Sequence, residues 1–528
     1  MYTAGAASGC AQNDSELVPF LLAGLCHPVP EVKTLTAKAL ASLGLGSGGG
    51  GISGRVQPGT MTEEGGRRAS RCRALLQPPL LPALVATLGD DNTGAAQAVA
   101  NTILALCEEA DRPLAVAAAQ TSTHRETTPC RRAVMSALLS QLPEVVAGLT
   151  NRQASTPKLR FADTAARLMS ASDPAFNVAL EVGALSLVTS LTEDASDVLL
   201  QLNALELLEQ VASTAGGARH LVAQGHLDRL LVAAGGGDEP EAPAPLLGAS
   251  ALRTLAKVLA KAEGAADVDV WRGRSSSFLQ GFLRACAVHI YGRDEAGKLA
   301  GLVAASTAAE ASNEALNAML SQQHGTQGVL DAWLTLSAHK TEVKAAALHA
   351  FALVLGLPTT SASPASPTAA WGGGGRRHRE EDGDEVMGDA DASQRREARS
   401  SLCRTLFERL GVCNTRHTAG ALLLELARQP VPEIRHAAYD VLRCTVWQPG
   451  GWGLSAVFTQ PGFRGFLMDR DSAASKATKE WKFSVVEAIM ACKERAMLGE
   501  EALESFKLFL KQGPFWVPAK RRDLATAE

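Results

Sequence analysis

One stretch of the sequence has the glycine and lysine spacing of a phosphate-binding loop. The segment GRDEAGKL, residues 292 to 299, places Gly292, Gly297 and Lys298 as such a loop requires. The loop also needs a Ser or Thr hydroxyl after the lysine to reach Mg²⁺, and Leu299 stands there instead. No β-strand pattern leads into the segment. The sequence therefore predicts a turn between helices at this place and no nucleotide site.

The other residue types that could do chemistry also lack the spacing that a site would need. Cys403, Cys413 and His417 do not match a zinc finger and have no fourth ligand. The ten cysteines include no Cys-X-X-Cys pair, the eleven histidines show no pairing, and no GxSxG nucleophile elbow is present. We therefore predict no enzyme activity, no cofactor and no metal, and we interpret the cysteines as reduced thiols.

A phrase that occurs three times indicates what the chain is built from. The copies HPVPEVKTLTAKALA, residues 27 to 41, and QPVPEIRHAAYDVLR, residues 429 to 443, place Pro30 and Pro432 in the first turn of a predicted helix. An acidic residue follows each proline, near the positive end of the helix dipole. The third copy, HKTEVKAAALHAFALVL, residues 339 to 355, keeps the acidic, β-branched and basic order.

Apolar residues follow each copy of the phrase at helical spacing. Helices of this kind cannot bury their apolar faces alone and must stack on copies of themselves, as in HEAT and armadillo repeats. We therefore predict an all-α fold: a HEAT/armadillo-like α-solenoid, which is a curved superhelix of helical hairpins. The predicted buried residues are Val32, Leu35, Ala39, Leu40 and Leu43 in the first copy, Ile434, Ala437, Ala438, Val441 and Leu442 in the second, and Ala347, Phe351 and Val354 in the third.

Composition and charge limit the class of protein. The chain of 528 residues is 46% hydrophobic and 5% aromatic, and its formal net charge is −4. A general nucleic-acid binder would carry a basic excess. No apolar run approaches the ~20 residues of a membrane span, and the first residues lack the layout of a secretory signal. We expect a cytoplasmic or also nuclear protein, monomeric when free, that binds neither nucleic acid nor membrane.

Three stretches of low complexity divide the chain. Residues 44 to 68 are rich in glycine and predict a flexible loop within an N-terminal solenoid arm, residues 1 to 355. Residues 235 to 245 predict a shorter turn between repeats. Residues 356 to 399 alternate Ser/Pro, glycine, basic and acidic blocks and predict a disordered insertion. Because the repeat phrase occurs on both sides, we assign residues 400 to 528 to further solenoid repeats and a cap.

Aromatic residues concentrate near the C-terminus. Of the 14 Phe, 7 Trp and 3 Tyr, 13 lie after residue 400. One explanation is a tighter core in the terminal repeats, because buried aromatic rings usually serve packing. The other is an anchor surface for a protein partner, because Trp and Tyr are enriched at binding hot spots.

The sequence after the last repeat carries several motifs in a fixed order. These are Pro461-Gly462-Phe463, the pair Asp469-Arg470, the lysines Lys476, Lys479 and Lys482 around Trp481, and Gly513-Pro514-Phe515-Trp516-Val517. In order and spacing they resemble the C-terminal region of the 26S proteasome non-ATPase regulatory subunit 5 family. Weaker similarity extends upstream through the phrase at residues 429 to 443 and through residues 195 to 225.

The resemblance implies a function as well as a fold. Members of this family are HEAT/armadillo-type chaperones for assembly of the proteasome regulatory particle base. They bind the C-terminal domain of an AAA-ATPase subunit, in base precursor complexes, and are absent from the mature 26S particle. The alternative is a general armadillo/HEAT scaffold or transport adaptor. An adaptor would hold an extended peptide on an Asn/Trp ladder, and Trp is sparse before residue 401.

A basic strip is the candidate binding site for such a partner. Lys476, Lys479 and Lys482 recur at every third residue of a predicted helix, which keeps them near one face. We hypothesise that this strip, with Trp481 or Phe483, meets an acidic surface of the ATPase domain. The alternative is an ordinary solvated face, since exposed charges contribute little to binding or stability.

Overall fold

The computed structural model describes most of the chain as α-helix. The described residues are 17–45, 63–121, 128–147, 149–193, 197–236, 245–263, 276–323, 328–356, 389–415, 418–470 and 475–516. Within them there is no β-strand, so the predicted all-α class is confirmed. The chain forms two compact units, residues 1–226 and 227–528.

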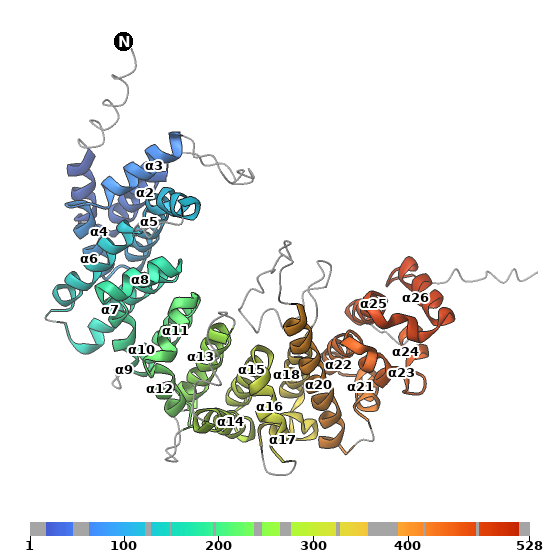
Figure 1. The fold of residues 1–528 in the computed structure, drawn as a ribbon. Helices are drawn as coiled ribbons and strands as arrows, with labels where there is room; N and C mark the ends of the chain where they lie inside the picture. The colour runs from blue at the N-terminus through green and yellow to red at the C-terminus, as the bar shows by residue number, and fades with distance from the viewer. Residues whose placement is uncertain are drawn as a thin grey trace, which may run out of the picture. The chain divides into compact units, whose positions relative to one another are not determined.

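In the first unit, consecutive helices fold back on one another (Figure 1). One helix of each successive repeat packs on the next, in the order α2, α5, α7 and α10, while α3, α4, α6, α8 and α9 pack on these. The helices are α2 (Pro30–Leu45), α3 (Glu63–Leu75), α4 (Leu80–Leu88), α5 (Thr93–Thr121), α6 (Pro129–Val146), α7 (Asn151–Met169), α8 (Asp173–Val182), α9 (Ser186–Glu193), α10 (Val198–Val211) and α11 (Ala215–Ala223).

The second unit repeats this arrangement. Here α13, α15, α18, α22 and α25 pack side by side in chain order, as the green to red part of Figure 1 shows. This succession of stacked helices is an α-solenoid. The helices are α12 (His226–Ala233), α13 (Pro245–Glu263), α14 (Ser276–Tyr291), α15 (Glu295–Ala311), α16 (Asn313–Leu320), α17 (Val329–Leu334), α18 (Thr341–Leu355), α20 (Asp389–Cys413), α21 (Ala419–Arg428), α22 (Pro432–Val446), α23 (Trp452–Phe458), α24 (Phe463–Met468), α25 (Lys476–Ala491) and α26 (Glu500–Gln512).

The repeated phrase begins a stacking helix in all three places. α2 starts at Pro30 and α22 at Pro432, each with its acidic residue in the first turn, and the third copy forms α18. The predicted stripes of α18 and α22 are confirmed, since all eight of their residues are buried. α18 and α22 pack directly on each other, so each apolar face is covered by the next copy of the repeat.

The predicted stripe of α2 is wrong in part. Leu35 is 65% exposed and Ala39 is exposed, whereas Ala37, Leu40 and Gly44 are buried. Two of these three have small side chains because α5 approaches closely. The Thr102 hydroxyl of α5 donates to the Ala37 carbonyl at 3.0 Å. Apolar residues surround nearly the whole helix, so their spacing alone did not single out the packed face.

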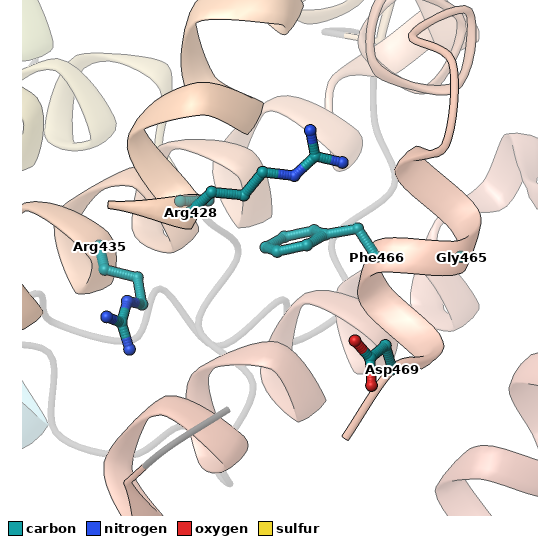
Figure 2. Close-up of a pocket in the computed structure, with 6 residues that line it drawn as sticks. Arg428, Arg435, Gly465, Phe466 and Asp469 are labelled. Carbon is teal, nitrogen blue, oxygen red and sulfur yellow. The ribbon is translucent and has the colours of Figure 1, made fainter. Parts of the chain in front are cut away.

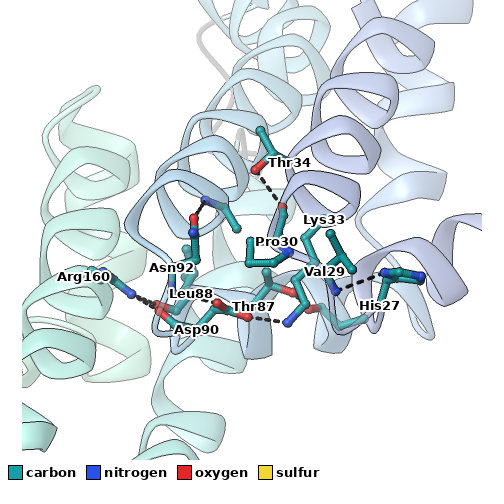
Figure 3. Close-up of polar contacts among 12 residues, drawn as sticks. His27, Val29, Pro30, Lys33, Thr34, Thr87, Leu88, Asp90, Asn92 and Arg160 are labelled. Atoms are coloured by element: carbon teal, nitrogen blue, oxygen red, sulfur yellow. Dashed lines mark hydrogen bonds and ion pairs between the residues drawn. The ribbon is translucent and has the colours of Figure 1, made fainter.

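Polar contacts connect α2, the first copy of the phrase, to the turn between α4 and α5 (Figure 3). Lys33 forms an ion pair with Asp90, in the turn that precedes α5. From α7, Arg160 donates to the carbonyl oxygens of Leu88 and Asp90 in the same turn. Lys33 of α2 thus contacts the turn that precedes α5, the helix on which α2 packs.

The low-complexity stretches lie largely outside the described residues. α2 continues to Leu45 and α3 begins at Glu63, so helices occupy both ends of the loop predicted for residues 44 to 68. Residues 46–62, 237–244 and 357–388 are not among the described residues. Helix α20 begins at Asp389, within the stretch predicted as an insertion. The predicted division at residues 355 and 400 stays a prediction.

Within the described residues, no single helix has the length and hydropathy to cross a membrane. Only α8 and α9 taken together reach these criteria, and they are bent by 71° at their junction.

Candidate partner-binding site

The predicted basic strip begins at the N-terminal end of α25. The hydroxyl of Ser475 caps this helix by accepting a hydrogen bond from the Thr478 backbone N–H at 3.1 Å. Lys476 is exposed, lies 3.9 Å from Glu480, and places its ammonium 5.5 Å from the centre of the Phe515 ring. These contacts of Lys476 are compatible with a charged surface that a partner could use.

The third lysine of the strip does not lie on that surface. Lys482 is 2% exposed, and its Nζ donates to the backbone carbonyls of Phe466 at 2.8 Å and Asp469 at 2.7 Å. Each residue of an α-helix turns by about 100°. Six residues therefore carry Lys482 about 120° around the helix from Lys476. The prediction that all three lysines share one solvent face is wrong, while a partner-binding role for Lys476 and the half-buried Lys479 stays a prediction.

Burial also changes the acid–base behaviour of Lys482. Its pKa is lowered to about 8, chiefly because its ammonium is removed from water. The positive charges of Arg435 and Arg428 lower the pKa further, and the Asp469 carboxylate opposes them. The low pKa of Lys482 therefore reflects mainly its burial.

The two aromatic residues of the strip are packing residues. Trp481 is 8% exposed, stacks on His436 with 6.2 Å between ring centres, and has the Arg443 guanidinium 5.3 Å from its ring. Phe483 is half-buried, with its ring centre 6.1 Å from that of Phe509 in α26. The prediction that either ring anchors a partner gains no support from these positions.

Arg470 connects the family-like motifs to one another. Its guanidinium donates to the carbonyls of Phe509 and Gly513 at 3.0 and 3.2 Å and to the side chain of Gln512 at 3.1 Å. It also lies 4.0 Å from the ring centre of Phe509 and 5.3 Å from that of Trp516. Arg470 thus holds the end of α26 and the Gly-Pro-Phe-Trp segment against the end of α24.

Both explanations of the C-terminal aromatics apply to different residues. Six of the thirteen rings are buried in the core, including Tyr439, Phe463 and Phe506, each at most 1% exposed, and five more are half-buried. Phe515 and Trp516 are instead 48% and 41% exposed. They are the aromatic residues of this region that lie at the surface and could contact a partner.

A pocket opens between the ends of α21 and α22 and helix α24 (Figure 2). Its volume is about 370 Å³. The sequence-based search missed it, because Arg428 looked like an ordinary basic residue in the last turn of a helix. No spacing rule links residues 428, 435 and 466 before the fold is known. The lining residues are Ala427, Arg428, Arg435, Gly465, Phe466 and Asp469.

In the apparent phosphate-binding loop, only residues 292–294 form the predicted turn between helices, and the rest of the segment is the start of α15. Asp294 caps α15, and its carboxylate accepts a hydrogen bond from the Gly297 N–H at 2.7 Å. The cap therefore occupies the amide that a phosphate would need. Of the weighed zinc-ligand candidates, Cys403 and Cys413 are buried in α20, and His417 lies outside the described residues.

Comparison with known proteins places this region in context. Residues 389–528 match the family model described as "Proteasome non-ATPase 26S subunit". The resemblance to this family is confirmed there. The 26S proteasome non-ATPase regulatory subunit 5 of Bos taurus is 32% identical over 93 residues, and that of Homo sapiens 31% over 93 residues. These alignments span 17% of this chain and 18% of the length of each relative.

Solved structures of repeat proteins are also similar to the chain. An engineered protein aligns with 92% of this chain and 98% of its own, at 14% identity and a TM-score of 0.39. A designed armadillo repeat protein aligns with 59% of this chain and 99% of its own, at 14% identity and a TM-score of 0.33.

Proposed function

We propose that the protein is a non-catalytic chaperone for assembly of the base of the 26S proteasome regulatory particle. In this proposal it binds the C-terminal domain of an AAA-ATPase subunit in base precursors and is absent from the mature particle. The single observation that supports it most is the match of residues 389–528 to a proteasome non-ATPase subunit family. That match covers helices α20 to α26, the Arg470 contacts and the pocket beside Arg428.

The architecture supports a binding role. Stacked repeats contact mainly their neighbours, so a solenoid offers an extended surface on which a folded domain can lie. At the C-terminal end, Lys476, Phe515 and Trp516 combine exposed positive charge with exposed aromatic area. Trp is enriched among the residues that carry most of the binding energy at protein interfaces. We include Lys476 and Lys479 in the proposed contact surface.

The cysteines support a reducing compartment as the place of action. Those within the described residues form no disulfide, and all of them except Cys26 are buried. Burial raises the pKa of Cys72 to about 11 and that of Cys130 to about 12, which keeps both as unreactive thiols. We therefore propose a cytoplasmic location, with the nucleus as a further site.

A direct binding experiment tests the proposed function. The full chain is mixed in turn with each purified AAA-ATPase C-terminal domain of the proteasome base, and complexes are separated by size-exclusion chromatography. We expect one domain to form a one-to-one complex. The amino-terminal parts of the same ATPases serve as controls and should elute separately. Failure of every C-terminal domain to bind would reject the chaperone proposal.

A further inference from the structure

The pocket beside Arg428 has the size and lining of a ligand site. Its volume of about 370 Å³ lies at the lower end of the range for pockets that hold small groups. Figure 2 shows Arg428 extending over Phe466 at one side of the opening, with Arg435 and Asp469 at other sides of it. The lining thus combines an aromatic surface with two guanidinium groups.

Arg428 is the group in the pocket best placed to meet a ligand. It is exposed, and its guanidinium lies 5.3 Å from the centre of the Phe466 ring. Among the residues that the structure describes, no hydrogen bond or ion pair engages this guanidinium. A guanidinium presents parallel N–H donors that match the two oxygens of a carboxylate. Arg428 can therefore receive such a group without breaking a hydrogen bond or ion pair to the described residues.

Arg435 adds a fixed positive charge on the opposite side. Its Nε and Nη2 donate to the Gln429 carbonyl at 2.9 and 2.8 Å, and its Nη1 lies 3.4 Å from the Thr478 hydroxyl. These acceptors are neutral, so they orient the guanidinium without cancelling its charge. Arg435 occupies the position that Lys33 has in the first copy of the repeat phrase. Lys33 pairs with Asp90, whereas Arg435 lines a pocket.

Lys482 adds a further positive charge next to Phe466. Its ammonium lies 4.3 Å from the centre of the Phe466 ring, and its low pKa results in part from the charges of Arg428 and Arg435. Asp469 is the acidic residue of the lining. Three cationic groups against one carboxylate leave the pocket with a positive potential, which favours an anionic ligand.

We infer that this cavity, the Arg428 pocket, binds the carboxylate of an aspartate or glutamate side chain of a protein partner. The choice of a protein as the source of the carboxylate rests on the proposed function. Phe466 offers an apolar surface to the methylene groups of such a side chain. Asp469, exposed at the opening, repels a second negative charge and so disfavours phosphate.

Saturation-transfer NMR on the full chain tests the inference with defined probes. The first probe is the blocked peptide acetyl-Ala-Ala-Glu-Ala-Ala-amide, and the second has Gln in place of Glu. The third is acetyl-pentaalanine with a free carboxyl terminus, and inorganic phosphate is the fourth, used as a competitor. Binding is compared for wild type, Arg428→Gln and the control Arg464→Gln. Arg464 is half-buried, lies on α24 and forms an ion pair with Glu501.

If the Arg428 pocket binds an acidic side chain, the affinities of the peptides must differ between probes and between variants. The Glu peptide binds wild type and Arg464→Gln equally, and Arg428→Gln weakens it about tenfold, the loss of one charge-assisted pair. The Gln peptide binds at least tenfold more weakly than the Glu peptide. Equal binding of the Glu and Gln peptides, or no effect of Arg428→Gln, overturns the inference. Preference for phosphate or for the free carboxyl terminus overturns the choice of an acidic side chain.

A second readout separates this inference from the proposed function. Arg428→Glu is tested for binding to the ATPase domain that wild type captures. We expect loss of affinity, restored when the partner's acidic residue is changed to lysine. Unchanged domain binding by Arg428→Glu would reject the pocket as a contact and leave the chaperone proposal standing. If no ATPase domain binds wild type, the peptide titrations still decide whether the pocket takes a carboxylate.

Discussion

Replacement of Arg470 by alanine should release the C-terminal helix from the rest of the second unit. The guanidinium makes three hydrogen bonds to the end of α26 and lies 4.0 Å from the Phe509 ring centre. At about 1 kcal/mol net for each hydrogen bond and ~0.5 kcal/mol for the ring contact, the loss is about 3.5 kcal/mol. Since 1.4 kcal/mol corresponds to a factor of ten, α26 should open roughly 300-fold more often.

Native-state hydrogen exchange of residues 500 to 512 measures this opening. Arg464→Ala is the matched control, because Arg464 also joins α24 to α26, through an exposed ion pair with Glu501 and a hydrogen bond to the Ser505 hydroxyl at 3.2 Å. The exposed pair contributes about 0.2–1 kcal/mol and the hydrogen bond about 1 kcal/mol, so this variant should accelerate exchange by at most about 30-fold. Equal acceleration in the two variants would refute the assignment of Arg470 as the principal contact that holds α26.

Three further variants test other parts of the second unit. The pKa of Lys482 is lowered from 10.5 to about 8, so between these pH values the unfolded chain binds more protons at this lysine than the folded chain does. The free energy of unfolding of wild type, relative to Lys482→Met, should therefore rise by up to about 3 kcal/mol as the pH increases from 8 to 10.5. Urea unfolding midpoints measure this difference, and a difference that does not change with pH would contradict the prediction. Asp440→Ala should lower the free energy of unfolding by about 3–5 kcal/mol, because Asp440 accepts a hydrogen bond at 2.9 Å from Arg443, whose buried charge would lose its partner. A fall in the thermal midpoint no larger than that of a variant at an exposed site would contradict this prediction. Lys476→Glu combined with Lys479→Glu should weaken binding of the ATPase domain about tenfold with unchanged circular dichroism, and unchanged affinity would remove the basic surface from the proposal.

The sequence predicts which face of a helix is buried well where apolar residues occupy one face alone. In α22, polar residues separate the stripe that begins at Ile434, and every predicted residue is buried. In α2, alanines and leucines surround the helix, and the packed face is decided by the close approach of Thr102 to Ala37. That approach depends on a residue 65 positions away, which the local pattern does not contain.

The candidate site shows a similar limit. Spacing placed Lys476, Lys479 and Lys482 together, but the turn of the helix directs Lys482 to the carbonyls of α24. The pocket beside Arg428 combines three helices, and its residues share no sequence pattern. Family-like motifs identified the right region of the chain, whereas the groups that face a partner emerge only from the packing of that region.

The measurement that tests the central proposal most directly is the distribution of the protein among proteasome assembly states. Extract from cells that express the tagged full chain is resolved on a native gel, and each band is analysed by mass spectrometry. The proposal predicts that the protein migrates with AAA-ATPase subunits in base precursors and is absent from the complete 26S particle. Recovery with the complete particle in proportion to its other subunits, or without any proteasome ATPase, would contradict it.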